Sequence, residues 1–227
     1  RVEELRAAGA KYVFLKTGAY RPADLARAIA WSYKYGIDML PVDGAGGGTG
    51  MSPWKMMNEW GMPPVELHSL LYTYAKQLAD AGRPVPALVL AGGFVFEDQI
   101  FKGLAIGAPF VKMVGMARSP IAAAMVGKTI GKTIDESQLP VYVERFGRTR
   151  DEIFVTSADL RALVGNDEFE KLPTGAIGLY TYYERLAQGL RQLMCGSRKF
   201  AMSYIARDDI ASLTHDAAQV SGIQYTL

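Results

Sequence analysis

Four short stretches of this sequence combine glycine with side chains that could contact a charged ligand. They are "LKTG" with Lys16, "DGAGGGTG" with Asp43, "LAGGF" with a glycine pair, and "VGMAR" with Arg118. Because glycine lacks a Cβ, successive backbone N–H groups can crowd around phosphate oxygens. A lysine or arginine nearby can add a charge-assisted hydrogen bond. Together the four stretches predict a site for a phosphate-bearing ligand.

Each stretch closes an apolar run that is typical of a buried strand, and a helical pattern follows it. Strands that alternate with helices imply a parallel sheet, whose ligands bind beyond the carboxyl ends of the strands. The spacing fits either a (β/α)₈ barrel or a doubly wound sheet, and four units make half of a closed barrel. The expected strands are 11–18, 37–44, 86–93 and 108–117, and the expected helices are 21–36, 63–82, 97–107 and 119–130.

Taken singly, each candidate residue also has a structural interpretation. Lys16 could lay its aliphatic stem along a strand end, and Asp43 could accept hydrogen bonds from its own loop. The pair Gly92-Gly93 could form a tight turn and nothing more. For Lys112, inside the last apolar run, we favour a structural role. The functional interpretation depends on the agreement of all four strand ends.

Composition excludes several other classes of site. The chain has 227 residues and a net charge of +2, so nucleic acid and membrane binding have little support. Cys195 is the single cysteine, and the two histidines, His68 and His215, lie far apart in the sequence, so no metal site is expected. We find no long apolar run and no signal-peptide pattern, so we expect a cytoplasmic protein.

The second half of the chain has a helical character. The segments 140–147 and 149–165 are expected to form short helices separated by turns, and 175–200 a long helix. The segment 206–222 is expected to form one capped helix that stops at Gly222. We therefore divide the chain into a βα domain, 1–127, and a helical extension packed on it, 128–227.

Three segments resemble the FMN-binding synthase domain of glutamate synthases and of stand-alone glutamate-synthase-like proteins. They are "KTGAYRPADLARAI", "VDGAGGGTGMSP" and "LAGGFVFEDQIFKGLAIGAPFVKMVGMARS", and the resemblance covers roughly residues 10–125. It implies a TIM barrel with FMN at its carboxyl face. The four βα units match the C-terminal half of that barrel, and the tail is similar to the terminal extension of stand-alone members.

The resemblance also implies roles for individual residues. The glycine pair and the end of the last strand would cradle the FMN phosphate. Lys16 would lie near the N1/O2 edge of the flavin, where a cation stabilises the anionic reduced form. Lys16 and Asp43 are the candidate catalytic residues. The candidate cofactor-binding residues are Lys16, Gly47, Gly48, Thr49, Gly50, Gly92, Gly93, Gly115, Met116, Ala117 and Arg118, with 47–50 against the flavin ring or the substrate.

The implied reaction is the reductive amination of 2-oxoglutarate through 2-iminoglutarate to L-glutamate, with hydride from reduced FMN. Ammonia would come from solution or, by way of a partner, from glutamine, and an electron-donor protein is possible. The region after Arg118 lacks the cysteines that ligate an iron–sulfur centre in full synthases. Two alternatives stay open: a flavin enzyme with another substrate, or a catalytically incomplete half barrel that pairs with the missing half or with a copy of itself.

Overall fold

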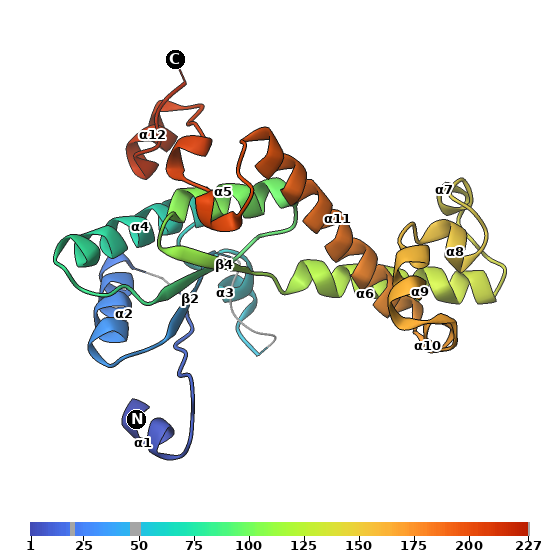
Figure 1. Cartoon of the computed structure of the whole chain (residues 1–227), viewed down its shortest axis with the longest axis horizontal. Coiled ribbons are helices and arrows are strands. Elements are labelled where there is room, and N and C mark those ends of the chain that lie inside the picture. The colour runs from blue at the N-terminus through green and yellow to red at the C-terminus, as the bar shows by residue number, and fades with distance from the viewer. Residues whose placement is uncertain (19–20, 46–50, 227) are drawn as a thin grey trace. The chain divides into compact units, whose positions relative to one another are not determined.

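The structure, a computed structural model, describes residues 1–18, 21–45 and 51–226 and divides into two compact units (Figure 1). The first unit comprises Arg1–Met116 and Gln192–Leu227, and the second comprises Ala117–Arg191. The domain boundary expected between residues 127 and 128 falls within helix α6 (Arg118–Asp135). That division of the chain stays a prediction.

A four-stranded parallel sheet forms the centre of the first unit, as the alternating pattern predicted. Its strands are β1 (Thr17–Gly18), β2 (Met39–Asp43), β3 (Ala87–Ala91) and β4 (Val111–Gly115), in the spatial order β1-β2-β3-β4. The register pairs Gly18 with Asp43, Asp43 with Ala91, and Ala91 with Gly115. The carboxyl ends of all four strands therefore form one row across the sheet.

Three crossover helices cover one face of this sheet: α2 (Pro22–Lys34), α4 (Pro64–Asp80) and α5 (Glu97–Gly107). Helix α4 packs between α2 and α5 (Figure 1). Proline at the first turn of α2 and of α4 suits a helix start, because the first amide has no partner within the helix. The core between these layers is aliphatic, with Leu25, Leu40, Val42, Leu67, Leu71, Leu88 and Leu90 all 0% exposed.

The opposite face of the sheet carries alternate residues of each strand. Leu40 and Val42 of β2 are fully buried, whereas Met39, Pro41 and Asp43 are only half-buried. Successive side chains of a strand point to opposite faces, so this second set shares the face that the crossover helices leave uncovered. Met113 of β4, which pairs with Val89, also lies on that face.

The first strand is shorter than the expected segment 11–18. Val13 donates its N–H to the side chain of Asp38 at 2.7 Å, so a carboxylate takes the place of a backbone partner there. Phe14 then forms an isolated bridge to Met39, and regular pairing begins at Thr17. The short helix α1 (Val2–Ala7) precedes this segment, and α3 (Trp54–Asn58) lies between β2 and α4.

The expected single helix over 206–222 is wrong. The segment forms a 3₁₀ turn, η2 (Arg207–Asp209), followed by a short helix, α12 (His215–Ser221). Another 3₁₀ turn, η1 (Met202–Tyr204), precedes the segment. Between η2 and α12, the backbone of Ser212 exchanges hydrogen bonds with Gln224 and Thr226, which keeps the chain extended. Helix α12 does stop at Gly222 as expected, in a left-handed conformation with φ of 65°.

The second unit is helical, as expected. It contains α6, α7 (Val141–Glu144), α8 (Arg150–Ile153), α9 (Ser157–Val164), α10 (Asn166–Lys171) and most of α11 (Thr174–Gly196). Its core cluster is Phe154, Leu160, Phe169 and Ile177. Glycine lets α6 and α11 approach closely, since a Cβ added at Gly127 would lie 2.6 Å from the carbonyl oxygen of Thr174. None of the helices that the structure describes is both long and apolar enough to cross a membrane.

His68 is a buried polar residue on α4, in the core of the first unit. Its ring stacks on Phe94 with centroids 5.6 Å apart and an interplanar angle of 9°. Burial lowers the pKa of His68 from 6.5 to about 4. Among the described residues, its Nε2 atom has no hydrogen-bond partner. The folded protein therefore holds this imidazole neutral at ordinary pH.

We predict that stability falls at acidic pH because of His68. The unfolded chain binds a proton at the ordinary pKa and the folded chain only near pH 4. Stability is therefore full above about pH 6.5 and declines as the pH falls toward 4. Between pH 7.5 and 5.0 the loss should be on the order of 2 kcal/mol, measured by urea unfolding. His68→Phe should abolish this loss and His215→Phe should keep it; equal pH dependence in the wild type and His68→Phe would contradict the prediction.

Candidate functional site

The two candidate catalytic residues contact each other. Lys16 Nζ lies 3.0 Å from Asp43 Oδ2. The register places Lys16 opposite Pro41, so Lys16 and Asp43 share the sheet face that the crossover helices leave uncovered. The side chain of Lys16 is 61% exposed and that of Asp43 only 14%. The ammonium group thus has a fixed anionic neighbour and an open side toward solvent.

The glycines that follow β2 and β3 also contact each other. Gly44 donates its N–H to Ala91 O at 2.9 Å, which continues the strand pairing one residue beyond β2. A Cβ added at Gly92 would lie 2.8 Å from Gly44 N, and Gly92 has φ of +106°. Gly115, at the end of β4, would place a Cβ 3.3 Å from that of Ala91. Gly92 therefore leaves no room for a side chain, and Gly115 leaves little.

Gly93 differs from Gly92 because the space beside it is open. It has φ of +79°, and among the described residues an added Cβ would meet no atom within 4 Å. After Phe94, the N–H groups of Val95 and Phe96 donate to Gln99 Oε1 at 2.8 and 3.1 Å. The first turn of α5 also carries Glu97 and Asp98. An anion above Gly93 would therefore be held by amides of the glycine turn rather than by the end of α5, where two carboxylates oppose it.

The remaining predicted residues are placed less completely. Gly47, Gly48, Thr49 and Gly50 lie outside the described residues. Met116 ends the first unit, whereas Ala117 and Arg118 belong to the second, so their shared part in one site stays a prediction. Lys112 is exposed and donates to Pro109 O at 2.8 Å, a structural contact of the kind that we favoured. The part of the chain that the structure describes contains no cluster of His, Cys, Asp or Glu suited to a metal ion.

Sequence reasoning missed the pair formed by His68 and Phe94. Phe94 directly follows the glycine pair and is 8% exposed. A signal for His68 existed, because it stands three and seven residues before Leu71 and Ala75 on the buried stripe of α4. No pattern in the sequence indicated which aromatic ring His68 would meet.

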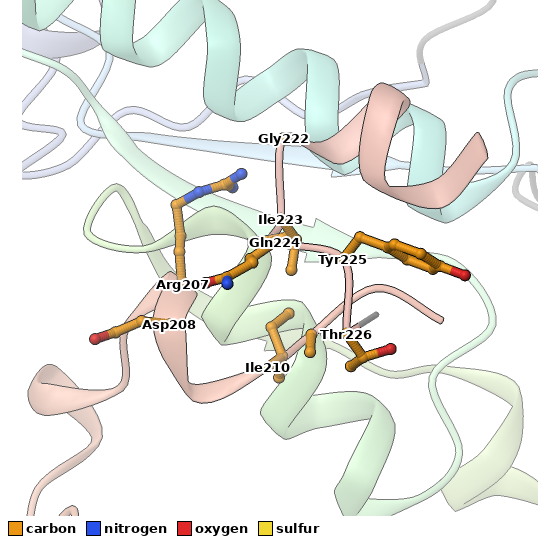
Figure 2. A pocket seen from close by; sticks show the side chains of 9 residues that line it. Arg207, Asp208, Ile210, Gly222, Ile223, Gln224, Tyr225 and Thr226 are labelled. Carbon is orange, nitrogen blue, oxygen red and sulfur yellow. The ribbon is translucent and has the colours of Figure 1, made fainter. Parts of the chain in front are cut away.

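A separate pocket of about 470 Å³ lies in the C-terminal segment (Figure 2). Arg207 borders it and joins the segment to the rest of the first unit: its guanidinium donates to the carbonyl oxygen of Ile106 and lies 3.8 Å from the ring centroid of Tyr72. The same guanidinium donates to the carbonyl oxygen of Ser221 within the segment. Burial lowers the pKa of Arg207 from its usual value. No predicted site residue lines this pocket, which is bordered by Arg207, Asp208, Ile210, Ala211, Gly222, Ile223, Gln224, Tyr225 and Thr226.

Comparisons with known proteins give matches that cover about half of the chain. A relative from Bacillus subtilis (strain 168), the glutamate synthase large subunit-like protein YerD, is 31% identical over 114 residues. The match covers 49% of this chain and 21% of the relative, so the chain spans about a fifth of that protein's length. The family described as the conserved region in glutamate synthase matches residues 1–126, which include the whole sheet and its crossover helices. The chain therefore belongs to the glutamate synthase family.

Proposed function

We propose that this chain is part of an FMN-dependent oxidoreductase of the glutamate synthase type. The reaction would be the reductive amination of 2-oxoglutarate, through 2-iminoglutarate, to L-glutamate. The observation that carries the proposal is the Lys16–Asp43 ion pair beside the Gly44–Gly92 contact, at the carboxyl ends of the strands in a chain of this family. Ligands of parallel βα folds bind at the carboxyl ends of the strands.

The residues at the carboxyl ends of the strands fit a phosphate-bearing flavin. Gly93 offers open space and a left-handed turn, so backbone N–H groups can face a phosphate there. Gly115 and Met116, and in our proposal Ala117 and Arg118, would complete the cradle. When bound, FMN would supply the hydride chemistry. The protein would supply the binding, the orientation and the charge around the flavin ring.

Lys16 and Asp43 would then act as one unit. Lys16 would place its cation beside the electron-rich edge of the ring and favour the reduced, anionic flavin. Asp43 would hold that ammonium group in place through the 3.0 Å contact. The glycine stretch 47–50 would line the ring and the substrate. Because the pair lies on the uncovered sheet face, it can meet a ligand without any displacement of the helix layer.

We further propose that the four strands form the C-terminal half of a TIM barrel. The sheet face that carries Lys16 and Asp43 also carries Phe14, which is 56% exposed, and Met113, which is 45% exposed. In a closed barrel this face would be the interior and would be covered by side chains of the other strands. The exposed apolar side chains therefore support the barrel.

The same observation supports a second candidate, a catalytically incomplete half barrel that pairs with a missing half or with a copy of itself. In the described sheet, β1 and β4 are edge strands, and unpaired edges favour association. Sedimentation at micromolar concentration separates the candidates, because a well-folded, strictly monomeric chain would argue against pairing. Other elements of the proposal are a cytoplasmic location, ammonia from solution or from glutamine, and a separate electron-donor protein.

The proposed function is tested with the native, full-length protein. It should be yellow or take up FMN on titration, and with reduced flavin it should convert 2-oxoglutarate and ammonia to glutamate. A colourless protein that takes up no FMN would exclude the proposal. A protein that binds FMN but forms no glutamate would instead be a flavin enzyme with another substrate.

We predict that Lys16→Met weakens FMN binding about tenfold or more, since a hydrogen bond to a charged group contributes about 1.5–3 kcal/mol. It should also lower the reduction potential of the bound flavin, because the anionic reduced form loses its cation. Flavin fluorescence quenching and a redox titration measure the two effects. Lys112→Met is the matched control, because Lys112 is an exposed lysine of the same sheet that contacts Pro109 O. If both variants bind FMN alike, Lys16 does not contact the flavin.

We also predict that Gly93→Ala weakens FMN binding beyond its effect on folding. Gly82 provides a matched control, since it has φ of +69° and, like Gly93 with φ of +79°, open space around it. Alanine at either position should cost about 1–2 kcal/mol of stability from the left-handed backbone. Only Gly93→Ala should raise the FMN dissociation constant. Equal dissociation constants for the two variants would remove the turn from the proposed cradle.

A further inference from the structure

We propose that His68 is a positioning residue for the glycine turn after β3, and that it acts through the ring of Phe94. The consequence for FMN rests on the proposed function above, whereas the placement of the turn does not. Neither His68 nor Phe94 is among the residues that the family resemblance assigns to the site. The inference comes from four contacts that converge on residues 92–96.

Phe94 is held between two helices of the core. On one side its ring is nearly parallel to that of His68 on α4, with an interplanar angle of 9°. The ring also lies against α5 at Gly103, where an added Cβ would be 2.8 Å from Phe94 Cε1. A side chain at position 103 would displace the ring. The position of Phe94 is therefore determined by the imidazole and by the absence of a side chain at Gly103.

The turn itself is fixed at both ends. Gly92 packs against the backbone of Gly44, and Val95 and Phe96 are bound through their N–H groups by Gln99. Gly93 lies between these ends with open space beside it. Because glycine populates many backbone conformations, Gly93 depends on its neighbours for its orientation. The buried ring of Phe94, one residue later, is the side chain that supplies this constraint.

The choice of histidine is not explained by stability. A buried polar atom without a partner lowers stability, and among the described residues Nε2 of His68 has none. An aliphatic residue would avoid this cost but would present no flat surface to Phe94. Sequences depart from the most stable choice mainly where function requires it. We therefore assign the flat ring at position 68, and not its nitrogen atoms, to the orientation of the turn.

The test compares His68→Leu, which removes the ring, with His68→Phe, which keeps a ring and removes the nitrogens. His215→Leu is the control. His215 also contacts an aromatic ring, that of Tyr225, with ring centroids 4.2 Å apart, but it lies in the C-terminal segment. Hydrogen exchange is measured on the FMN-free, full-length protein for amides of 93–96 and, as an internal reference, of β2. The FMN dissociation constant is measured at pH 7.5 for the same proteins.

In His68→Leu the amides of 93–96 should exchange about tenfold faster while those of β2 are unchanged, and FMN should bind about tenfold more weakly. His68→Phe should restore both values to within about twofold of the wild type. Unchanged exchange in the turn, an equal increase in β2, or a failure of His68→Phe to restore the turn would each overturn the proposal. If His68→Leu does not fold, Phe94→Leu removes the other ring of the stack and should give the same local effect. If the wild type binds no FMN, the proposed function fails, and the exchange comparison still decides the role of His68.

Discussion

Parallel pairing of β2 with β3 sets Asp43 opposite Ala91, and the other features of the site depend on that register. A shift of one residue would turn Asp43 toward the helix layer and bring Leu40 and Val42 onto the open face. Burial of Leu40, Val42, Leu88 and Leu90 against the crossover helices prevents this shift, since all four are 0% exposed. The aliphatic core thus determines on which face the charged residues lie.

The same register explains why small residues follow the strands. Gly44 donates its N–H to Ala91 O, one residue beyond the end of β2. The turn that follows Ala91 therefore runs close to the backbone of Gly44. Gly92 meets this requirement with a left-handed conformation and no Cβ, since a Cβ added there would lie only 2.8 Å from Gly44 N. Glycine at positions 44 and 92 is therefore a packing requirement first. Gly93 is under no such packing requirement, because among the described residues an added Cβ there would meet no atom within 4 Å.

Much of the first unit could be predicted from its sequence, because burial and helix periodicity leave local patterns. Helix α5 occupies the expected residues 97–107, and β3 lies within its expected range. The errors arose where a residue distant in the sequence supplied the hydrogen bond: the side chain of Asp38 binds Val13 N and shortens the first strand, and the backbones of Gln224 and Thr226 hold Ser212 extended within an expected helix. The parallel pattern placed Lys16 and Asp43 at strand ends, and the contact between them appeared only in the structure. The stack of His68 on Phe94 did not, because ring geometry between residues 26 positions apart leaves no periodic signal.

The Lys16–Asp43 pair is better understood through its orientation than through its strength. An ion pair with a lysine that is 61% exposed contributes at most about 1 kcal/mol to stability, so its geometry is not explained by folding. Asp43 is the buried partner and Lys16 the exposed one, so the pair is a dipole whose positive end faces outward on the open sheet face. A bound anion would meet a cation held in place by the sheet rather than a mobile side chain, which reduces the entropy lost on binding. Loss of Lys16 and loss of the Asp43 charge would therefore affect a bound anion in different ways. Without Lys16, the half-buried carboxylate of Asp43 would repel the anion. Without the Asp43 charge, the cation would remain but would no longer be held in place.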